Sequence, residues 1–397
     1  WIAASWDPDP PLHEWRIRLV DSGWACPTWP IDLYGRGLDT VGARAVADEL
    51  AAVGAPGPAA GSAMRLAAPT ILAHANHDLA RRLLRPIATG EETWCQLFSE
   101  PGNGSDLAGL ATRAERDGDE FVVTGQKVWT TGARTAAFGM LLARTDWDVP
   151  KHRGITYFAF PMRQAGVEVR PLRQMNGHAS FNEVFLTEAR VPASNVIGDE
   201  GGGWAVALTT LAHERGLGQG PPRTSRVSGR AAREAAAEAA EYARTYVWYP
   251  QRAGRADLAV PHAQAAHRSD DATARQAVAD LHGLDRVSRW TTERAAVARR
   301  QGHAPGPEGS VAKLAGSEIA RRSGRVHTNL AGAAGMLAGP GAGFDGVVAE
   351  ILVSTPAASI AGGTDEIQRN IVGERALGLP KEPDDTRDQP YRAVRRN

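Results

Sequence analysis

Ser99-Glu-Pro-Gly-Asn-Gly-Ser-Asp106 decides the fold, together with Gly363-Thr-Asp-Glu-Ile-Gln-Arg-Asn370 and the intervening His213-Glu-Arg215. A loop of glycine, asparagine and small hydroxyl residues allows positive φ and close approach of another molecule to its backbone. Such a loop can receive a phosphate group or a flat ring. Taken alone, the first stretch is more typical of an ordinary surface turn, so its meaning depends on the segments that accompany it.

A second segment of this kind, Gly125-Gln-Lys-Val-Trp-Thr-Thr-Gly132, follows about twenty residues later. Trp129 offers a plane for stacking, and Thr130 and Thr131 offer hydroxyl groups for hydrogen bonds to ring nitrogens or a carbonyl. The simpler interpretation is a strand that ends with a core Trp. The two loops together favour a site for a flat, polar ligand.

Composition and charge exclude several classes of protein. The chain has 397 residues, which predicts two or three domains, and its 45 basic residues balance 45 acidic ones, so no overall field attracts nucleic acid or a membrane surface. Cys26 and Cys95 lack metal-ligand spacing, which predicts neither a disulfide framework nor a metal site. No apolar run is long enough to span a bilayer, and the first residues lack a signal-peptide pattern. We therefore expect a cytoplasmic protein.

Three regions of the chain differ in periodicity. Residues 1–93 predict an all-α domain. Residues 94–200 alternate as strands do, with Gly and Pro at short intervals, which favours an antiparallel barrel or sandwich over βαβ units. Residues 201–397 return to helical sequence and predict a helical bundle, apart from 250–271, which has no clear period and is expected to be a loop.

The fold class is therefore α+β. No Gly-x-Gly-x-x-Gly motif opens a helix after a strand, which argues against a Rossmann site. The expected strands are 120–124, 138–144, 155–160, 167–170 and 183–186. The expected long helices of the last region are 229–242, 275–300, 310–330 and one that starts near Thr364.

With this order of regions, six segments resemble the acyl-CoA dehydrogenase family across nearly the whole chain. They are 97–112, 124–132, 181–192, 201–216, 306–314 and 361–380. Members of the family use FAD to remove the α- and β-hydrogens of an acyl-CoA thioester in the β-oxidation of fatty acids or steroid side chains. They leave a trans-2-enoyl-CoA and pass electrons to an electron-transfer flavoprotein. The resemblance implies an N-terminal helical domain, a central β-barrel domain and a C-terminal four-helix bundle.

The resemblance assigns contacts with the flavin ring of FAD residue by residue. Phe98 and Ser99 match positions that touch the isoalloxazine. Trp129 and Thr131 match the pair that lines its other side. These four residues are the expected binding site of the ring.

Contacts with the rest of the cofactor are assigned in the same way. Gly104 and Ser105 match the loop that meets the pyrophosphate or the acyl-CoA, so Ser105 is also an expected substrate contact. Thr364 and Glu366 match positions near the phosphate and ribose of FAD, at the start of a helix whose dipole favours anions. An ordinary helix N-terminus with acidic residues would look the same, and both interpretations can hold.

The catalytic base must be a carboxylate that takes the α-proton next to the thioester. Many family members place a Glu just before the Gly-Thr of the last motif, but Gly362 stands there in this chain. A smaller branch, resembling isovaleryl-CoA and long-chain acyl-CoA dehydrogenases, places the Glu directly before an Arg on a bundle helix. Glu214 matches that position, and Arg215 and Gly363 are expected to contact the substrate. The alternatives for Glu214 are a solvated ion pair and a carboxylate at the edge of the core.

The resemblance also implies how the developing enolate is stabilised. The backbone N–H of Gly362 and a ribityl hydroxyl of FAD are the expected donors to the thioester oxygen, an oxyanion-hole arrangement. A backbone donor survives the loss of the Glu side chain. The hydride then leaves the β-carbon for N5 of the flavin.

Two departures from the family pattern concern FAD shared between subunits. The usual Arg-x-x-Phe-Gly is missing from 242–254, and Arg252 or Arg275 is the candidate replacement. The usual Gln-x-x-Gly-Gly appears as Asn329-Leu-Ala-Gly332-Ala, so Asn329 and Gly332 are the expected contacts with the adenine end. These weakened motifs favour either a homo-dimer or tetramer with altered contacts or a hetero-oligomer with a related chain.

Segment 306–314 resembles an actinobacterial group that includes such paired chains and acts on bulky substrates such as steroid side chains. Three alternatives to the acyl-CoA dehydrogenase interpretation remain. A flavin monooxygenase or oxidase of the same fold would use oxygen. A dehydrogenase of an acyl group tethered to a carrier protein would keep the chemistry. An FAD-poor partner subunit would be a binding module without catalysis of its own.

Overall fold

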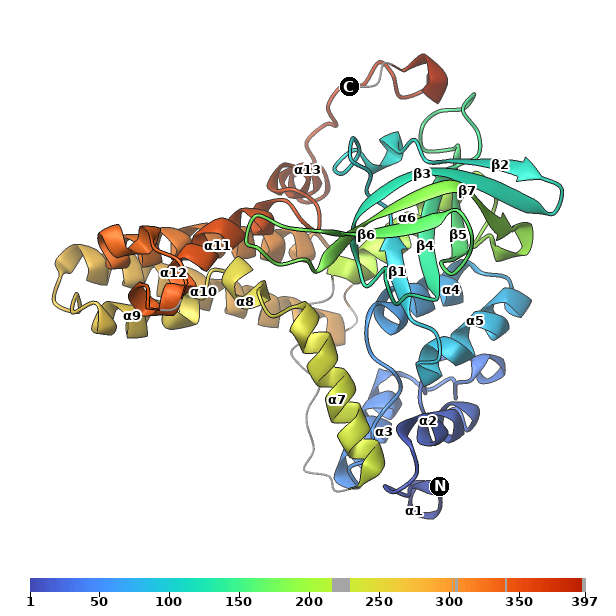
Figure 1. Ribbon diagram of the computed structural model, residues 1–397, viewed down its shortest axis with the longest axis horizontal. Coiled ribbons are helices and arrows are strands. Elements are labelled where there is room, and N and C mark those ends of the chain that lie inside the picture. The colour runs from blue at the N-terminus through green and yellow to red at the C-terminus, as the bar shows by residue number, and fades with distance from the viewer. Residues whose placement is uncertain (216–228, 302, 304–305, 340, 395–397) are drawn as a thin grey trace. The chain divides into compact units, whose positions relative to one another are not determined.

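The structure is a computed structural model that describes residues 1–397 except 216–228, 302, 304–305, 340 and 395–397. The chain divides into two compact units (Figure 1). Unit 1 contains Trp1–Leu172, Ala179–Thr245 and Asp384–Asn397, and unit 2 contains Arg173–His178 and Tyr246–Pro383. No helix of the described part is both long and apolar enough to cross a membrane.

Unit 1 begins with short helices, as the sequence predicts. They are α1 (Ile2–Ser5), α2 (Leu12–Asp21), α3 (Thr40–Ala52), α4 (Ala68–His74) and α5 (His77–Thr89). The ends of α5 follow local chemistry, since the Asn76 side chain accepts a hydrogen bond from the backbone N–H of Leu79 and Gly90 takes the left-handed conformation with φ 86°. Its apolar face lies in the helical core, where Leu83, Leu84 and Ile87 are almost fully buried.

A seven-stranded sheet follows, and it positions the loops singled out above. The strands are β1 (Trp94–Leu97), β2 (Arg113–Asp117), β3 (Glu120–Thr131), β4 (Phe138–Arg144), β5 (Ile155–Pro161), β6 (Val167–Leu172) and β7 (Phe181–Pro192). Their order is β1-β4-β2-β3-β7-β6, with β5 paired to β4. The sheet is mixed, because β1 and β2 pair with β4 in parallel whereas the other pairings are antiparallel.

The five expected strands are confirmed, and β3 and β7 are longer than their apolar runs suggested. Both continue over 12 residues because they pair with each other along most of their length. The purely antiparallel pattern is corrected by the parallel pairings of β1 and β2 with β4. Neither strand was predicted, because β1 has only four residues and four of the five residues of β2 are charged.

Unit 1 also holds α6 (Gly203–Arg215) and α7 (Arg230–Thr245). Thr210 of α6 shares hydrogen bonds with Thr70 of α4 at 2.9 Å and with the Tyr157 hydroxyl of β5 at 3.1 Å. This buried polar contact joins the N-terminal helices, the sheet and the helix that carries Glu214.

The regular secondary structure in the described part of unit 2 is helical, and Arg173–His178 contributes a turn. The unit contains α8 (Tyr249–Arg252), α9 (Ala259–Ala265), α10 (Ala272–Arg300), α11 (Glu308–Ala331), α12 (Val347–Ser354) and α13 (Asp365–Ala376). The helices predicted over 229–242, 275–300 and 310–330 and from Thr364 are confirmed. Among them α10 and α11 pack along each other, and α11 also packs on α12 and α13.

The expectation of a loop over 250–271 is wrong, because this stretch contains α8 and α9. Each helix has only one or two turns, so neither produces a detectable period. Tertiary packing holds them instead. His262 of α9 is 3% exposed and lies against His327 of α11, with 2.9 Å between their Nδ1 atoms.

Candidate functional site

The Ser99–Asp106 loop is anchored to the sheet by a buried ion pair. Lys127 of β3 is fully buried, and its Nζ lies 2.8 Å from Oε1 of Glu100 and donates to the Phe98 carbonyl at 3.1 Å. The same Glu100 carboxylate accepts hydrogen bonds from the backbone N–H groups of Ala111 at 2.7 Å and Thr112 at 2.9 Å. This carboxylate therefore ties the first residues of the loop to Ala111 and Thr112, which lie beyond its end.

The ionisation of this pair follows from its surroundings. Burial alone would raise the pKa of the Glu100 carboxyl, but Lys127 and the hydrogen bonds to it outweigh burial and hold that pKa below its ordinary value. Burial also lowers the pKa of the Lys127 ammonium, more than Glu100 raises it. Only the ionised form of the Glu100 carboxyl accepts all three short hydrogen bonds, so the charged pair is the favoured state.

Trp129 lies on a β-bulge that presents its ring to solvent. Lys127 faces Val184 and Thr130 faces Asn182, so β3 has one extra residue between them. Trp129 has φ 63°, a left-handed conformation that is unusual for a large side chain, and its side chain is 55% exposed. The edge-to-face contact with Phe181, 5.6 Å between ring centroids, fixes the ring. Bulges that redirect a side chain are frequent beside active sites.

The two loops of the first site lie against each other. The backbone N–H of Val128 donates to the Ser99 carbonyl at 2.9 Å, which joins the bulge to the Ser99–Asp106 loop. Phe98 is buried and makes an edge contact with Tyr157. Gly104 and Ser105 are exposed, and a Cβ at Gly104 would meet no heavy atom within 4 Å. An exposed Trp129 ring on a strained backbone, next to the exposed Ser99–Asp106 loop, fits a flat ligand with phosphate groups.

Glu214 lies at the end of α6, beside the strand that leads into this loop. Its Oε2 accepts a hydrogen bond of 3.4 Å from Nε2 of Gln96, on β1, two residues before Phe98. The carboxylate is half-buried, and Arg215 is the last residue of α6. The structure therefore brings the predicted base to the start of the Ser99–Asp106 loop. Sequence reasoning missed Gln96, although a polar residue in the apolar stretch Trp94–Leu97 was a usable signal.

A second group of predicted residues lies in unit 2, at the start of α13. Gly362 and Gly363 have φ of 71° and 84°, and the Thr364 side chain caps the helix by accepting from the N–H of Ile367. The buried Gln368 amide donates to the Gly362 carbonyl at 3.0 Å, and a Cβ at Gly363 would lie 2.6 Å from this amide nitrogen. The left-handed conformation at 363 therefore favours glycine, and a Cβ there would displace the Gln368 amide from this position.

Asp365 fastens this turn to α11. Its carboxylate is 3% exposed and accepts from Lys313 Nζ at 2.8 Å and from Arg321 Nη1 at 2.6 Å. Burial would raise the pKa of the Asp365 carboxyl, but the two cations and their hydrogen bonds lower it well below its usual range. Sequence reasoning identified Thr364 and Glu366 but missed the residue between them, whose partners are far away in the chain. Glu366 itself is exposed.

Replacing Asp365 with Asn should lower the free energy of unfolding by about 1–3 kcal/mol, because a hydrogen-bonded charge with two cationic partners is lost. The native pKa is lowered, so the carboxylate stabilises the fold above its ordinary pKa of 3.8, and this contribution disappears as pH falls through the native value. Denaturant titration of the purified protein near neutral pH measures the loss. Glu366→Gln, at an exposed carboxylate, is the matched control, and equal stability of the two variants would contradict the anchoring role of Asp365.

The remaining predicted cofactor residues are exposed positions of unit 2. Arg275 lies on α10, Asn329 lies near the end of α11, and Gly332 follows that helix with φ 56°. The Asn329 carbonyl accepts from Arg268 at 2.6 Å. Arg252, the other candidate for the missing arginine, lies over the ring of Tyr249 at 5.1 Å. The helices α10 and α11, which carry Arg275 and Asn329, pack along each other.

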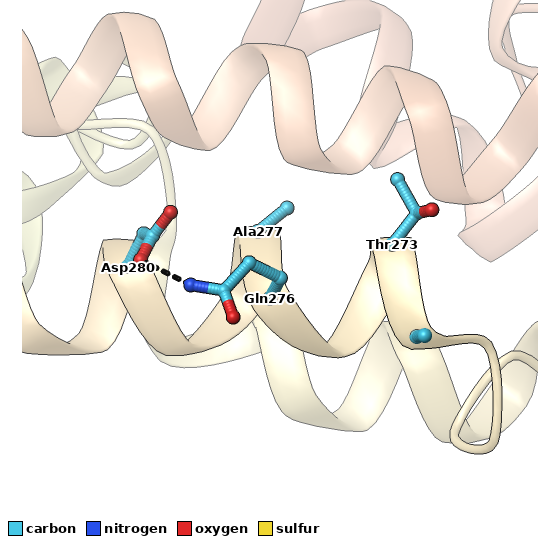
Figure 2. A pocket seen from close by; sticks show the side chains of 5 residues that line it. Thr273, Gln276, Ala277 and Asp280 are labelled. Atoms are coloured by element: carbon cyan, nitrogen blue, oxygen red, sulfur yellow. Dashed lines mark hydrogen bonds between the residues drawn. The ribbon is translucent and has the colours of Figure 1, made fainter.

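A shallow hollow of about 480 Å³ lies beside Arg275 on the first turns of α10. Figure 2 shows Thr273, Gln276, Ala277 and Asp280 along this helix, with the Gln276 amide donating to Asp280 at 2.8 Å. None of the lining residues is a predicted site residue, so we assign it no catalytic role. The described residues also contain no cluster of three or more His, Cys, Asp or Glu side chains suited to a metal ion.

Comparison with known proteins covers nearly the whole chain. Residues 2–91 match the family described as acyl-CoA dehydrogenase, N-terminal domain, residues 95–189 match its middle domain, and residues 201–377 match its C-terminal domain. Acyl-CoA dehydrogenase IpdE1 of Mycobacterium tuberculosis is 37% identical over 93% of this chain and 88% of its own length. Acyl-CoA dehydrogenase FadE34 of the same organism is 36% identical over 94% of this chain, but over only 47% of its own length.

Two of the similar solved structures have the same residue as this chain at more than a quarter of the aligned positions. The ChsE4-ChsE5 complex from Mycobacterium tuberculosis shows 29% identity and a TM-score of 0.64, and the match covers 94% of this chain and 90% of that one. The Tcur3481-Tcur3483 steroid ACAD shows 27% identity and a TM-score of 0.67 over 94% of this chain and 89% of that one.

Proposed function

Because this chain belongs to the acyl-CoA dehydrogenase family and is an oxidoreductase, we propose that it binds FAD and converts an acyl-CoA thioester to its trans-2-enoyl-CoA. One observation carries the proposal further than the family assignment. Trp129 is held in a strained, exposed conformation beside the anchored Ser99–Asp106 loop. A fold that keeps a large ring in this position has a use for it, and a flavin ring is the ligand that matches it.

The residues of unit 1 would hold the flavin ring. Trp129 offers its face, Thr131 its hydroxyl, and Phe98 and Ser99 form the floor that the Lys127 contact with the Phe98 carbonyl keeps in place. Ser105, exposed in the glycine-rich loop, would bind phosphate oxygens. When bound, FAD supplies the acceptor for the hydride that leaves the β-carbon.

Residues of unit 2 would bind the phosphate, ribose and adenine parts of FAD. Thr364 caps α13, and the free N–H groups of that first turn favour a phosphate. Glu366 is exposed and suited to ribose hydroxyls. Arg275, Asn329 and Gly332 remain proposed contacts with the adenine end, on the strength of the family pattern alone.

Glu214 is the proposed base that takes the α-proton. Its carboxylate is half-buried and already accepts a hydrogen bond from Gln96, which orients it next to the strand leading to Phe98. The backbone N–H of Gly362 is the proposed donor to the thioester oxygen, where negative charge develops as the proton leaves. The positive φ of Gly362 and the Gln368 bond to its carbonyl fix the peptide group that follows it. Electrons would then pass to an electron-transfer flavoprotein.

We further infer that the substrate is a bulky acyl-CoA such as one with a steroid side chain, and that a related chain completes the assembly. Two structures similar to this chain are each described with a pair of protein names. One is the ChsE4-ChsE5 complex, and the other is the Tcur3481-Tcur3483 steroid ACAD. More than half of FadE34 lies outside the match, which leaves room for a second chain of this length. The altered motifs at 242–254 and at Asn329 agree with a partner that supplies the missing contacts.

Removing the Trp129 ring should weaken FAD binding. Trp129→Ala is expected to raise the dissociation constant of FAD about 5- to 10-fold, because a stacking contact between aromatic rings contributes ~1 kcal/mol. Trp129→Phe retains a ring and should lose much less. Titration of flavin-free protein with FAD, followed by flavin fluorescence, measures the effect. Equal affinity of the Ala and Phe variants would contradict the stacking role.

Product analysis tests the proposed reaction and its substrate class together. Purified protein is incubated with straight-chain, branched and steroid-side-chain acyl-CoA thioesters and an artificial electron acceptor, and products are identified by mass. Loss of two hydrogens from one class supports the proposal and identifies that class. An oxygenated product, or activity only on carrier-protein thioesters, would contradict it. The same assay with a co-expressed related chain tests the need for a partner.

A further inference from the structure

The last residues of the chain return to unit 1 and cover a part of the sheet near the Ser99–Asp106 loop. The C-terminal family match ends at residue 377, whereas Asp384–Asn397 belongs to unit 1. We call residues 384–394 the C-terminal strap. The strap therefore lies outside the part of the chain that matches the family. It belongs to unit 1, whereas the preceding helix α13 belongs to unit 2.

Tyr391 is the anchor of the strap. It is 4% exposed, and its hydroxyl donates to the carbonyl of Gly109. Its backbone N–H donates to the Val149 carbonyl at 2.9 Å, and its ring lies 5.5 Å from the ring of Trp147. The N–H of Arg392 continues this pairing with a bond of 3.0 Å to the Trp147 carbonyl. The Tyr391 ring is buried, and both the backbone N–H and the hydroxyl of this residue are hydrogen-bonded. This packing is therefore specific rather than incidental.

Beneath Tyr391 lies the guanidinium of Arg144, at the end of β4. Arg144 is fully buried, and its carbon Cζ lies 3.6 Å from the centroid of the Tyr391 ring. Its nitrogens donate to the backbone carbonyls of Ala108 at 2.7 Å, Leu110 at 3.2 Å and Lys151 at 3.1 Å. The Tyr391 ring shields this cation from water. Away from water, the guanidinium interacts more strongly with the ring face and with the three carbonyls.

These contacts reach the glycine-rich loop through two routes. Gly109 and Ala108, which accept from Tyr391 and Arg144, form the short helical turn Leu107–Gly109 directly after the loop. Lys151, whose carbonyl accepts from Arg144, places its Nζ 2.9 Å from Oδ1 of Asp106. Asp106 follows Ser105, the proposed phosphate contact. One end of the loop is thus held by Glu100 and Lys127, and the other by Arg144 under the strap.

We propose that the C-terminal strap is a built-in clamp for this loop, with Tyr391 as a positioning residue that holds Ser105 in place for the phosphate groups of a ligand. Tyr391 does not touch the ligand. It acts by keeping Arg144 desolvated and the turn after the loop in register. The clamp itself stands on the contacts above, and only its effect on FAD rests on the proposed function.

Hydrogen exchange in the flavin-free protein tests the clamp directly. The amides of Gly109 and Leu110 bond within the turn, to Asp106 and Leu107. In Tyr391→Ala they should exchange roughly tenfold faster, because a buried hydrogen bond and a ring contact are lost together. Arg392→Ala is the matched control. It removes the exposed ion pair with Asp148, leaves Tyr391 seated, and should exchange like the unaltered protein.

FAD affinity tests the positioning role, with rescue as the safeguard against a misfolded variant. In the full-length protein, Tyr391→Ala should bind FAD about 5- to 10-fold more weakly. Tyr391→Phe keeps the ring over Arg144 and should restore most of the affinity. Unchanged exchange in Tyr391→Ala overturns the clamp, and faster exchange with unchanged FAD affinity overturns the positioning role. If the unaltered protein binds no FAD, the proposed function fails, and the exchange result still decides the clamp.

Discussion

Glu214→Gln is expected to slow the reduction of bound flavin by acyl-CoA about 10²- to 10⁴-fold, the contribution typical of a positioned general base. The amide keeps the size of the side chain and its contact with Gln96, but it has no basic oxygen that can hold the α-proton. Substrate affinity should change little, because the carboxylate acts on the reacting carbon rather than on the CoA. Anaerobic stopped-flow spectroscopy of the FAD-loaded variant measures the rate, and the concentration dependence gives the affinity.

The neighbouring exposed His213 provides the matched control for this experiment. His213→Gln alters the same turn of α6 and introduces the same side chain, so it should reduce flavin at close to the unaltered rate. A near-normal rate in Glu214→Gln would remove Glu214 from the role of base. Equal losses in the two variants would point to a distorted helix rather than to lost chemistry.

Lys127→Met should lower the free energy of unfolding by about 3–5 kcal/mol, since it leaves the buried Glu100 carboxylate without its cation. The substitution also removes the hydrogen bond from Lys127 to the Phe98 carbonyl, so the Ser99–Asp106 loop should loosen before the rest of the sheet. Denaturant titration measures the stability, with Arg170→Met as control. Arg170 pairs with Glu168 on the surface, where an ion pair contributes about 0–1 kcal/mol. A loss below about 1 kcal/mol in Lys127→Met would show that the pair does not hold the loop.

The same pair predicts the direction of the pH dependence. The pKa of Glu100 is lowered in the native state, so its carboxylate stabilises the fold above its ordinary pKa of 4.5, and the contribution is lost as pH falls through the native value. Stability measured across the acid range should therefore fall less steeply in Lys127→Met than in the unaltered protein. Asp365 contributes in the same sense and should keep part of the acid dependence in that variant.

What the sequence predicted well was set by local chemistry. The loop at Ser99–Asp106 follows from its glycines and asparagine, and the start of α13 follows from the capping residue Thr364. Continuous runs of mainly apolar residues gave β4 and β5 nearly to the residue. In these cases the residues that determine the conformation are neighbours in the chain.

What the sequence could not predict depends on partners far apart in the chain. Lys127 and Glu100 are separated by 27 residues, and nothing in either motif indicates that they meet. The Tyr391 hydroxyl and the Gly109 carbonyl are separated by 282 residues. The helices within 250–271 are too short to show a helical period in the sequence. Tertiary packing, such as that of His262 against His327, stabilises them instead. Tertiary contacts decide such elements, so no local pattern predicts them.

Anaerobic titration of the purified, FAD-loaded protein with acyl-CoA thioesters tests the central claim most directly. The visible absorbance of the flavin should disappear in proportion to the thioester added, for at least one class of acyl chain, because the α- and β-hydrogens leave the substrate together. A flavin-containing protein whose absorbance no acyl-CoA thioester bleaches would contradict the proposed dehydrogenation.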